Sequence, residues 1–316
     1  MTEFDLDFLA AARAARREFL IAVEEHRPAL YRYCRRLTSS AWDAEDLVQD
    51  TLVKAFATAA QTHDPIGKPL PWLVRVATNV WIDQLRRTRE VVADVVDWAD
   101  TAPTDPLEVR DALAELLHVL SPQERAAVVL KDVFDYSLAE IGAMLGTTTG
   151  AVKAALSRGR GRLVDEDRAA RKKHVDPPAR EVVDQVAEAF SSYDIDRMTD
   201  LFLEDAVCDV VGMVSEEGIE AIREGSILHT FSPAMTSRFR AEVREYDGEP
   251  VIVLHGWDVD AEGRPVTREE PTDVVRFETL GGKVRRMRWY YFCPETLTEV
   301  GQALGLTMET HGYRYA

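Results

Sequence analysis

Hydrophobic residues recur every three to four positions through the first ninety or so residues, the pattern of amphipathic helices. The repeating apolar positions are Leu20, Val23, Leu30, Tyr33, Leu37, Leu47, Val48, Leu52, Ala55 and Phe56. A stretch rich in proline and glycine from residue 61 to 71 interrupts them. We expect the next helix to begin at Pro71 or Trp72, because proline is tolerated in a first helical turn.

The pattern stops between residues 89 and 106, where aspartates and prolines predict a linker. Helices return from about 107 to 164. Two Ser-x-x-Glu sequences there, Ser121 to Glu124 and Ser137 to Glu140, predict capping boxes at helix starts. Gly146 should end the second helix and a threonine run should begin the next, which is a helix-turn-helix outline.

A second charged linker is expected from 165 to 177, and a different pattern follows it. Helical spacing comes first, with a third helix expected over residues 218–228. Alternating strands come next, with a hairpin turn at Asp247-Gly248 and a glycine turn at 281–282. The apolar tail should pack on the protein, with a helix at 295–304. This order predicts an α+β domain.

Composition adds a constraint on binding partners. The chain has 316 residues and a formal net charge of −17, which taken alone disfavours nucleic-acid binding. Basic residues nevertheless gather at 86–89 and 153–173. The three cysteines are far apart, which suggests reduced thiols and a cytoplasmic location. No membrane span or signal peptide is expected.

Two segments resemble region 2 of the extracytoplasmic-function group of RNA polymerase sigma factors. They are the acidic stretch Ala44 to Thr51 and the stretch from Pro71 to Arg87. Residues 120–125 and 137–163 resemble region 4 of the same family. The resemblance implies that an acidic helix face docks the clamp of the polymerase core. Its candidate residues are Asp43, Asp46, Gln49 and Asp50.

The same resemblance implies that the second region 2 stretch melts the minus-ten element and that the loop before it captures a flipped base. An exposed stripe at helical spacing carries asparagine, which can bond base edges, and arginine, which can hold phosphate. The tryptophans are at least as plausible as core anchors. The candidate minus-ten residues are His63, Lys68, Trp72, Arg75, Asn79, Asp83, Arg86 and Arg87.

The second helix of the helix-turn-helix should enter the major groove at the minus-thirty-five element. Its candidate residues are Thr148, Thr149, Lys153, Ser157, Arg158 and Arg160. Ala154-Ala155 stands where the family has a Ser-Arg pair, so we expect weaker or different readout. Gly159 and Gly161 lower helix propensity and predict a loose last turn.

From about residue 178 the chain resembles a SnoaL-like domain, the cone-shaped fold of polyketide cyclases and nuclear transport factors. The resemblance implies that this domain regulates the sigma factor within one chain. It also implies a pocket, in which binding of a small-molecule ligand is an open alternative. Candidate pocket residues are Asp209, His229, His255, Trp257, Arg276, Trp289 and Tyr291. Their spacing forms no catalytic motif, so we expect no catalytic residues, cofactor or metal.

The sequence therefore predicts a multidomain protein with two all-α domains followed by an α+β barrel. The expected boundaries are 1–92 for region 2, 93–106 for the acidic linker, 107–164 for region 4, 165–177 for the second linker and 178–316 for the SnoaL-like domain with its tail. The expected partners are the polymerase core, through its clamp and flap, and double-stranded and melted promoter DNA, with no membrane. Two alternatives remain open. One is a stand-alone DNA-binding regulator, and the other is a ligand-sensing or enzymatic domain that the sigma half targets to promoters.

Overall fold

The computed structural model describes residues 3–62, 66–92, 120–165, 177–232 and 234–313. The chain divides into two compact units, Met1–Lys173 and His174–Ala316. The acidic linker expected at 93–106, and most of the one expected at 165–177, lie outside the described residues. Each unit is considered by itself.

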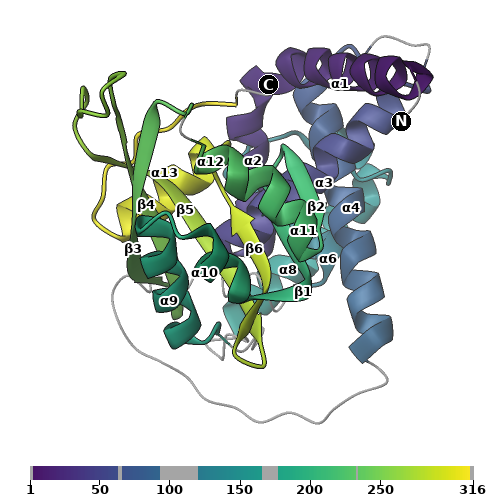
Figure 1. Ribbon diagram of the computed structural model, residues 1–316. Helices are drawn as coiled ribbons and strands as arrows, with labels where there is room; N and C mark the ends of the chain where they lie inside the picture. Colours follow the sequence, from purple (N-terminus) through teal and green to yellow (C-terminus); the bar gives the residue numbers. More distant parts are fainter. Residues whose placement is uncertain (1–2, 63–65, 93–119, 166–176, 233, 314–316) are drawn as a thin grey trace. The chain divides into compact units, whose positions relative to one another are not determined.

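Unit 1 is entirely helical in its described part (Figure 1). Its elements are α1 Glu3–Val23, the 3-10 turn η1 Glu24–His26, α2 Arg27–Thr38, α3 Ala41–Ala59, α4 Pro69–Val92, α6 Pro122–Val128, the π-helical turn η3 Val129–Val133, α7 Leu138–Met144 and α8 Thr149–Asp165. The helix expected from Pro71 or Trp72 begins two residues earlier, at Pro69. Proline still occupies the first turn, so the physical reason for the prediction holds.

The apolar stripes predicted for the first helices form the core of unit 1. Leu30, Leu37, Leu47 and Leu73 are each at most 1% exposed. Both predicted capping boxes are present, one at the start of α6 and one at the start of α7. These caps satisfy backbone N–H groups that have no partner in the first helical turn. Local sequence therefore sets where both helices begin.

Unit 2 is an α+β domain. Its elements are α9 Arg180–Ser191, α10 Ile195–Asp200, β1 Phe202–Val210, β2 Val214–Glu217, α11 Ile219–Ile222, η4 Arg223–Ile227, α12 Leu228–Thr230, β3 Ser237–Tyr246, β4 Glu249–Asp258, β5 Glu270–Leu280, β6 Lys283–Trp289 and α13 Pro294–Ala303. The six strands form one sheet in the order β2-β1-β6-β5-β4-β3. Figure 1 shows α9 and α10 lying across one face of this sheet.

Two features of unit 2 differ from the sequence expectation. Strands β1 and β2 were not predicted, and β1 runs parallel to β6, so the sheet is more than a meander. The helix expected over 218–228 is broken into three short pieces, with Gly225 in a non-helical conformation. An added Cβ at Gly225 would lie 2.0 Å from a carboxylate oxygen of Glu216, so this kink brings backbone against β2.

The predicted hairpin and tail helix of unit 2 are confirmed. Asp247 and Gly248 both have positive φ and join β3 to β4 in a hairpin. The tail helix is α13, which packs against β5. Beyond it, the Glu309 amide donates to the Pro271 carbonyl at 2.8 Å, so the tail returns to the start of β5.

Candidate functional site

The acidic residues of α3 divide between the surface and the interior of unit 1. Asp43 and Asp50 are exposed, whereas Asp46 and Gln49 are half-buried. Glu45, within the same acidic signature, is fully buried and forms an ion pair with the buried guanidinium of Arg27. Fewer acidic side chains are therefore exposed on α3 than the acidic sequence signature contains.

Asp50 also connects α3 to the next helix. Its Oδ2 accepts a hydrogen bond of 2.8 Å from the Gln84 side chain of α4. The acidic surface and the helix that follows it therefore share a polar contact, which the sequence pattern did not predict.

Along α4, the candidate minus-ten residues separate from the core stripe. Arg75, Asn79 and Asp83 are exposed, as is Lys68 just before the helix. Trp72 is half-buried, and Trp81 is a core residue at 4% exposure. His63 lies outside the described residues, and although Arg86 and Arg87 belong to α4, their side chains are not described.

A buried arginine joins the two helical regions of unit 1. Arg125 of α6 donates to the Leu37 carbonyl at 2.7 Å, and its guanidinium carbon lies 5.2 Å from the centre of a Trp81 ring. Burial lowers the pKa of Arg125 to about 10. Nearby, the rings of Tyr33 and Phe134 meet edge to face at 6.0 Å. Sequence reasoning missed Arg125, because only its tertiary surroundings distinguish it from other arginines.

The helix-turn-helix is built from α7 and α8. Gly146, at a φ of +62°, ends the α7 segment, and the Ala151 amide donates to Thr148 Oγ1 at the start of α8. Ala155, where the family has arginine, is buried at 7% exposure. The other candidates at this end of α8, Thr148, Thr149, Lys153 and Ser157, are all exposed.

The arginines of α8 are engaged with acids of the same unit. Arg158 Nε and Arg162 Nη1 donate to the two carboxylate oxygens of Glu124 at 2.9 and 2.7 Å. Arg160 pairs with Asp132. Gly159, which with Gly161 predicts a loose last turn, is buried where α8 crosses α6, and an added Cβ would lie 3.1 Å from Val128 Cγ2. The structure thus gives Gly159 a packing role that helix propensity does not describe.

A groove of about 520 Å³ runs beside the exposed face of α8. Its lining consists of Lys131, Leu138, Lys153, Leu156, Ser157 and Arg160. The lining therefore combines cations and a hydroxyl with two leucines, and two of the candidate minus-thirty-five cations, Lys153 and Arg160, share this hollow. Such a surface suits an anionic partner better than a cationic one.

The seven candidate pocket residues of unit 2 do not meet in one site. Alternation along the strands places Asp209, His255 and Arg276 on the outer face of the sheet, away from the core that Leu254 and Phe277 help to form. Asp209 binds Arg286 at 2.7 Å, and Arg276 binds Glu249 at 2.7 Å. Although burial opposes it, hydrogen bonds from Arg286 and Ser215 and the charge of Arg288 lower the pKa of Asp209.

On the outer face, His255 contacts Glu242 at 2.9 Å. The remaining four candidates are also dispersed. The Tyr291 ring stacks on His311 at 4.3 Å between centres. His229 is exposed on α12, and Trp257 is half-buried at the end of β4. Trp289 is the candidate that lies in the inner core.

On the core-facing side of the sheet, Trp289 contacts Asp273, an acid that sequence analysis did not single out. The carboxyl of Asp273 is fully buried, accepting from Trp289 Nε1 at 3.1 Å and from Thr272 Oγ1 at 2.7 Å. Burial raises the pKa of Asp273 to about 7, although both hydrogen bonds act in the opposite direction. Apolar side chains fill the rest of this interior, among them Phe190 and Phe231.

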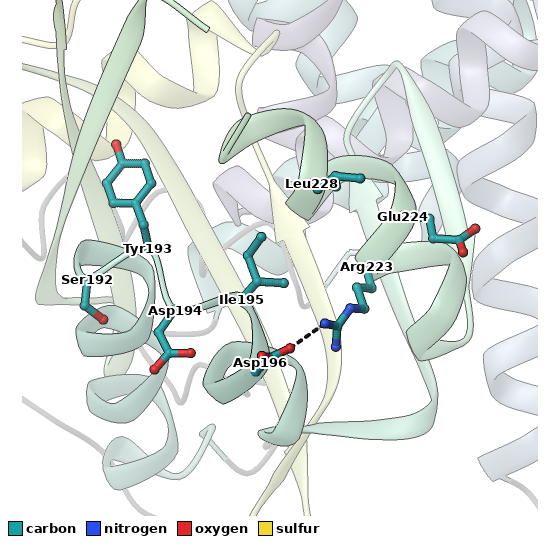
Figure 2. A pocket seen from close by; sticks show the side chains of 8 residues that line it. All are labelled: Ser192, Tyr193, Asp194, Ile195, Asp196, Arg223, Glu224 and Leu228. Carbon is teal, nitrogen blue, oxygen red and sulfur yellow. Dashed lines mark hydrogen bonds and ion pairs between the residues drawn. The ribbon is translucent and has the colours of Figure 1, made fainter. Parts of the chain in front are cut away.

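A hollow of about 600 Å³ lies elsewhere in unit 2, between the α9–α10 turn and the broken helix. Figure 2 shows its lining, Ser192, Tyr193, Asp194, Ile195, Asp196, Arg223, Glu224 and Leu228. Arg223 forms an ion pair with Asp196 across it. None of the residues predicted to line a pocket is among them.

Metal-binding clusters and membrane-spanning helices are both absent from the described residues. The part of the chain that the structure describes contains no group of three or more His, Cys, Asp or Glu arranged to hold a metal ion. Within that same part, no helix is both long and apolar enough to span a bilayer.

Comparison with known families matches all three segments that the sequence singled out. Sigma-70 region 2 matches residues 22–91, Sigma-70 region 4 matches 110–163, and a SnoaL-like domain matches 183–287. The chain is 32% identical over 254 residues to the ECF RNA polymerase sigma factor SigG of Mycobacterium tuberculosis, covering 69% of this chain and 68% of SigG.

Two other proteins of M. tuberculosis are similar to this chain. The ECF RNA polymerase sigma factor SigL is 36% identical over 154 residues, 46% of this chain and 86% of SigL. The crystal structure of the extracytoplasmic function sigma factor SigJ is 22% identical, with a TM-score of 0.34, covering 85% of this chain and 95% of that one. From the two sigma-70 regions in this order and the similarity to SigG, the chain belongs to the extracytoplasmic-function group of RNA polymerase sigma factors.

Proposed function

We propose that this sigma factor directs core RNA polymerase to promoters through three separate surfaces of unit 1. The α3 surface around Asp43 and Asp50 binds the clamp, the exposed stripe of α4 melts the minus-ten element, and α8 reads the minus-thirty-five element. Region 4 also contacts the flap. The observation that carries this proposal is the solvent exposure of these polar side chains opposite buried apolar stripes.

The charge of each surface supports its assignment. Carboxylates on α3 repel phosphate, so this surface suits a protein partner. Arg75 and Asn79 on α4 offer donors to bases and backbone, and Lys153 does so on α8. The acidic chain as a whole gains little from DNA alone, so promoter binding should depend on the polymerase.

A charge reversal tests the clamp surface. Asp43→Lys should weaken binding of the full chain to core polymerase by at least about tenfold, because it places a cation where an acid meets the clamp. Glu24→Lys makes the same change at an exposed position outside α3 and is the matched control. Equal affinities of both variants, measured by co-purification and titration, would contradict the clamp assignment.

Substitutions on α4 and α8 test the DNA surfaces separately. Asn79→Ala should reduce promoter opening, measured by reactivity of unpaired thymines, with little change in polymerase binding. Lys153→Ala should reduce output from promoters that depend on the minus-thirty-five element. Normal opening and output in both variants would remove α4 and α8 from promoter recognition.

We further propose that unit 2 regulates the sigma regions in cis, by holding them in a defined arrangement. What supports this is the tail, which is tied to its own domain by the Glu309 hydrogen bond and by stacking on Tyr291. A rigid unit 2 can act as a scaffold. A chain ending at Lys173, checked for helical content, should differ from the full chain in promoter output, and identical output would contradict the proposal.

We propose that unit 2 is not an enzyme, because apolar side chains fill the interior of its sheet. Ligand sensing is a second candidate function, favoured by the hollow in Figure 2. Its three carboxylates against one guanidinium suit a cationic amine. Thermal shifts of the full chain with a panel of amines, repeated on Asp194→Asn, would test for such a ligand.

A further inference from the structure

The capping glutamate of α6 has a second set of partners on the recognition helix. Glu124 is 3% exposed, and one of its oxygens accepts from the Ser121 amide at 3.0 Å, closing the capping box. The same carboxylate accepts from Arg158 and Arg162. Burial favours the neutral acid, but these hydrogen bonds outweigh it and hold the pKa of Glu124 below its usual value.

The packing of α6 against α8 makes this contact possible. Gly159 sits at the crossing point, where an added Cβ would meet Val128 Cγ2 at 3.1 Å and Glu124 Cβ at 3.5 Å. Arg158 and Arg162 are four residues apart, so they lie on one face of α8. A single carboxylate at the crossing can therefore reach both guanidinium groups.

The third arginine of α8 is held in a similar way. Arg160 donates through Nε and Nη2 to the two carboxylate oxygens of Asp132 in η3. Among the described basic residues of α8, Lys153 is then the one with no acidic partner. It lies exposed near the exposed Ser157.

The second capping box of the helix-turn-helix provides a comparison inside the same fold. Glu140 bonds to the Ser137 amide at 2.9 Å and to its hydroxyl at 2.7 Å, as a capping glutamate should. Its carboxylate is exposed and points to no arginine of α8. The cap alone therefore does not require the arginine contacts that Glu124 makes.

We propose that Glu124 and Asp132 restrain the arginines of α8 from binding DNA phosphates, so that Lys153 and Ser157 carry recognition of the minus-thirty-five element. This deepens the proposed promoter-reading role of α8 and rests on it. A guanidinium bonded to a carboxylate attracts phosphate less, because the carboxylate charge offsets a positive charge. Glu124 offsets one of the two charges of Arg158 and Arg162 and occupies donors of both, and Asp132 offsets the charge of Arg160. The restraint lowers sequence-independent affinity, which is made of such phosphate contacts, and so raises selectivity.

The test measures binding of the full chain to a fluorescent duplex without promoter sequence, as a function of salt. Glu124→Gln keeps a residue suited to the capping box but removes the charge. It should steepen the slope of log affinity against log salt by up to about 1.8, since each new phosphate contact adds about 0.9. Asp132→Asn, which touches no cap, should steepen it by about 0.9.

Glu140→Gln is the matched control, because it removes the same charge from the same kind of cap. It should leave the slope unchanged within error. Slopes of Glu124→Gln and Asp132→Asn equal to that of Glu140→Gln would overturn the proposal, as would equal absence of binding in all variants at low salt. If Glu124→Gln does not fold, as judged by circular dichroism, Asp132→Asn decides alone.

A separate assay tests the proposed promoter-reading function. If the wild-type chain with core polymerase gave no promoter-directed transcription, promoter recognition would be contradicted. It would leave the salt slopes untouched, since that assay uses neither polymerase nor promoter.

Discussion

The two units bury carboxylates in opposite ways. In unit 1, Glu45 is paired with Arg27, and Glu124 with two arginines. In unit 2, Asp273 is fully buried, and its hydrogen-bond partners among the described residues are neutral, Thr272 and Trp289. A cation compensates the loss of water around an ionised acid, whereas neutral donors compensate only in part.

The difference separates two uses of a buried acid. The unit 1 acids form ion pairs that fix helices and arginines in place. Asp273 instead retains its proton up to about pH 7. It is a pH-dependent element of the unit 2 core rather than an ion pair.

The largest effect is expected at the buried pair of region 2. Glu45→Ala leaves the guanidinium of Arg27 buried without this carboxylate, which should reduce the free energy of unfolding by about 3–5 kcal/mol. Denaturant unfolding of the full chain, followed through helical signal, measures it. A loss below about 1 kcal/mol would show that Arg27 reaches water or another acceptor. The double variant Arg27→Met with Glu45→Leu should recover much of the loss, because no buried charge remains.

The next effect concerns pH. The folded-state pKa of Asp273, about 7, lies above its ordinary value of 3.8, so between these values the folded state binds more protons than the unfolded state. Stability of unit 2 should therefore fall as pH rises from about 4 to 7, by at most about 1.4 kcal/mol per unit, and level off above. Asp273→Asn should remove this slope. Parallel curves for the two proteins, measured by tryptophan fluorescence during denaturation, would contradict it.

A buried cation gives an intermediate effect. Arg125→Ala removes the hydrogen bond to the Leu37 carbonyl and the contact with Trp81, and should destabilise unit 1 by about 2 kcal/mol. Arg36→Ala is the control, since Arg36 is an exposed arginine on α2. Calorimetry that finds equal melting temperatures for the two variants would mean that Arg125 does not join the helical regions.

The smallest effect is at the crossing of α6 and α8. Helix propensity alone predicts that Gly159→Ala stabilises by about 1 kcal/mol. The close approach to Val128 predicts the reverse, a loss of up to about 1 kcal/mol. An added Cβ at Gly150 would lie 3.8 Å from Thr148 Oγ1, an ordinary contact, so Gly150→Ala should show the propensity gain alone. If Gly159→Ala stabilises as much as Gly150→Ala, the crossing is looser than described.

Local features of the fold follow from short stretches of the amino-acid sequence. Ser121 with Glu124, and Ser137 with Glu140, set two helix starts, and Asp247-Gly248 set a hairpin. These follow from short-range rules on hydrogen bonds and backbone torsion, and neighbouring residues satisfy them. The apolar stripes likewise identified the buried faces of α2, α3 and α4.

Which distant groups meet depends on how the elements pack. Sequence analysis placed Asp209 and His255 in a pocket, whereas the pleat of the sheet directs both side chains to its outer face. Sequence analysis considered only the low helix propensity of Gly159, whereas this residue lies where α8 packs across α6. It passed over Asp273, whose burial depends on strands far apart in the chain. Charge and burial at such positions are set by contacts between elements, which local periodicity does not encode.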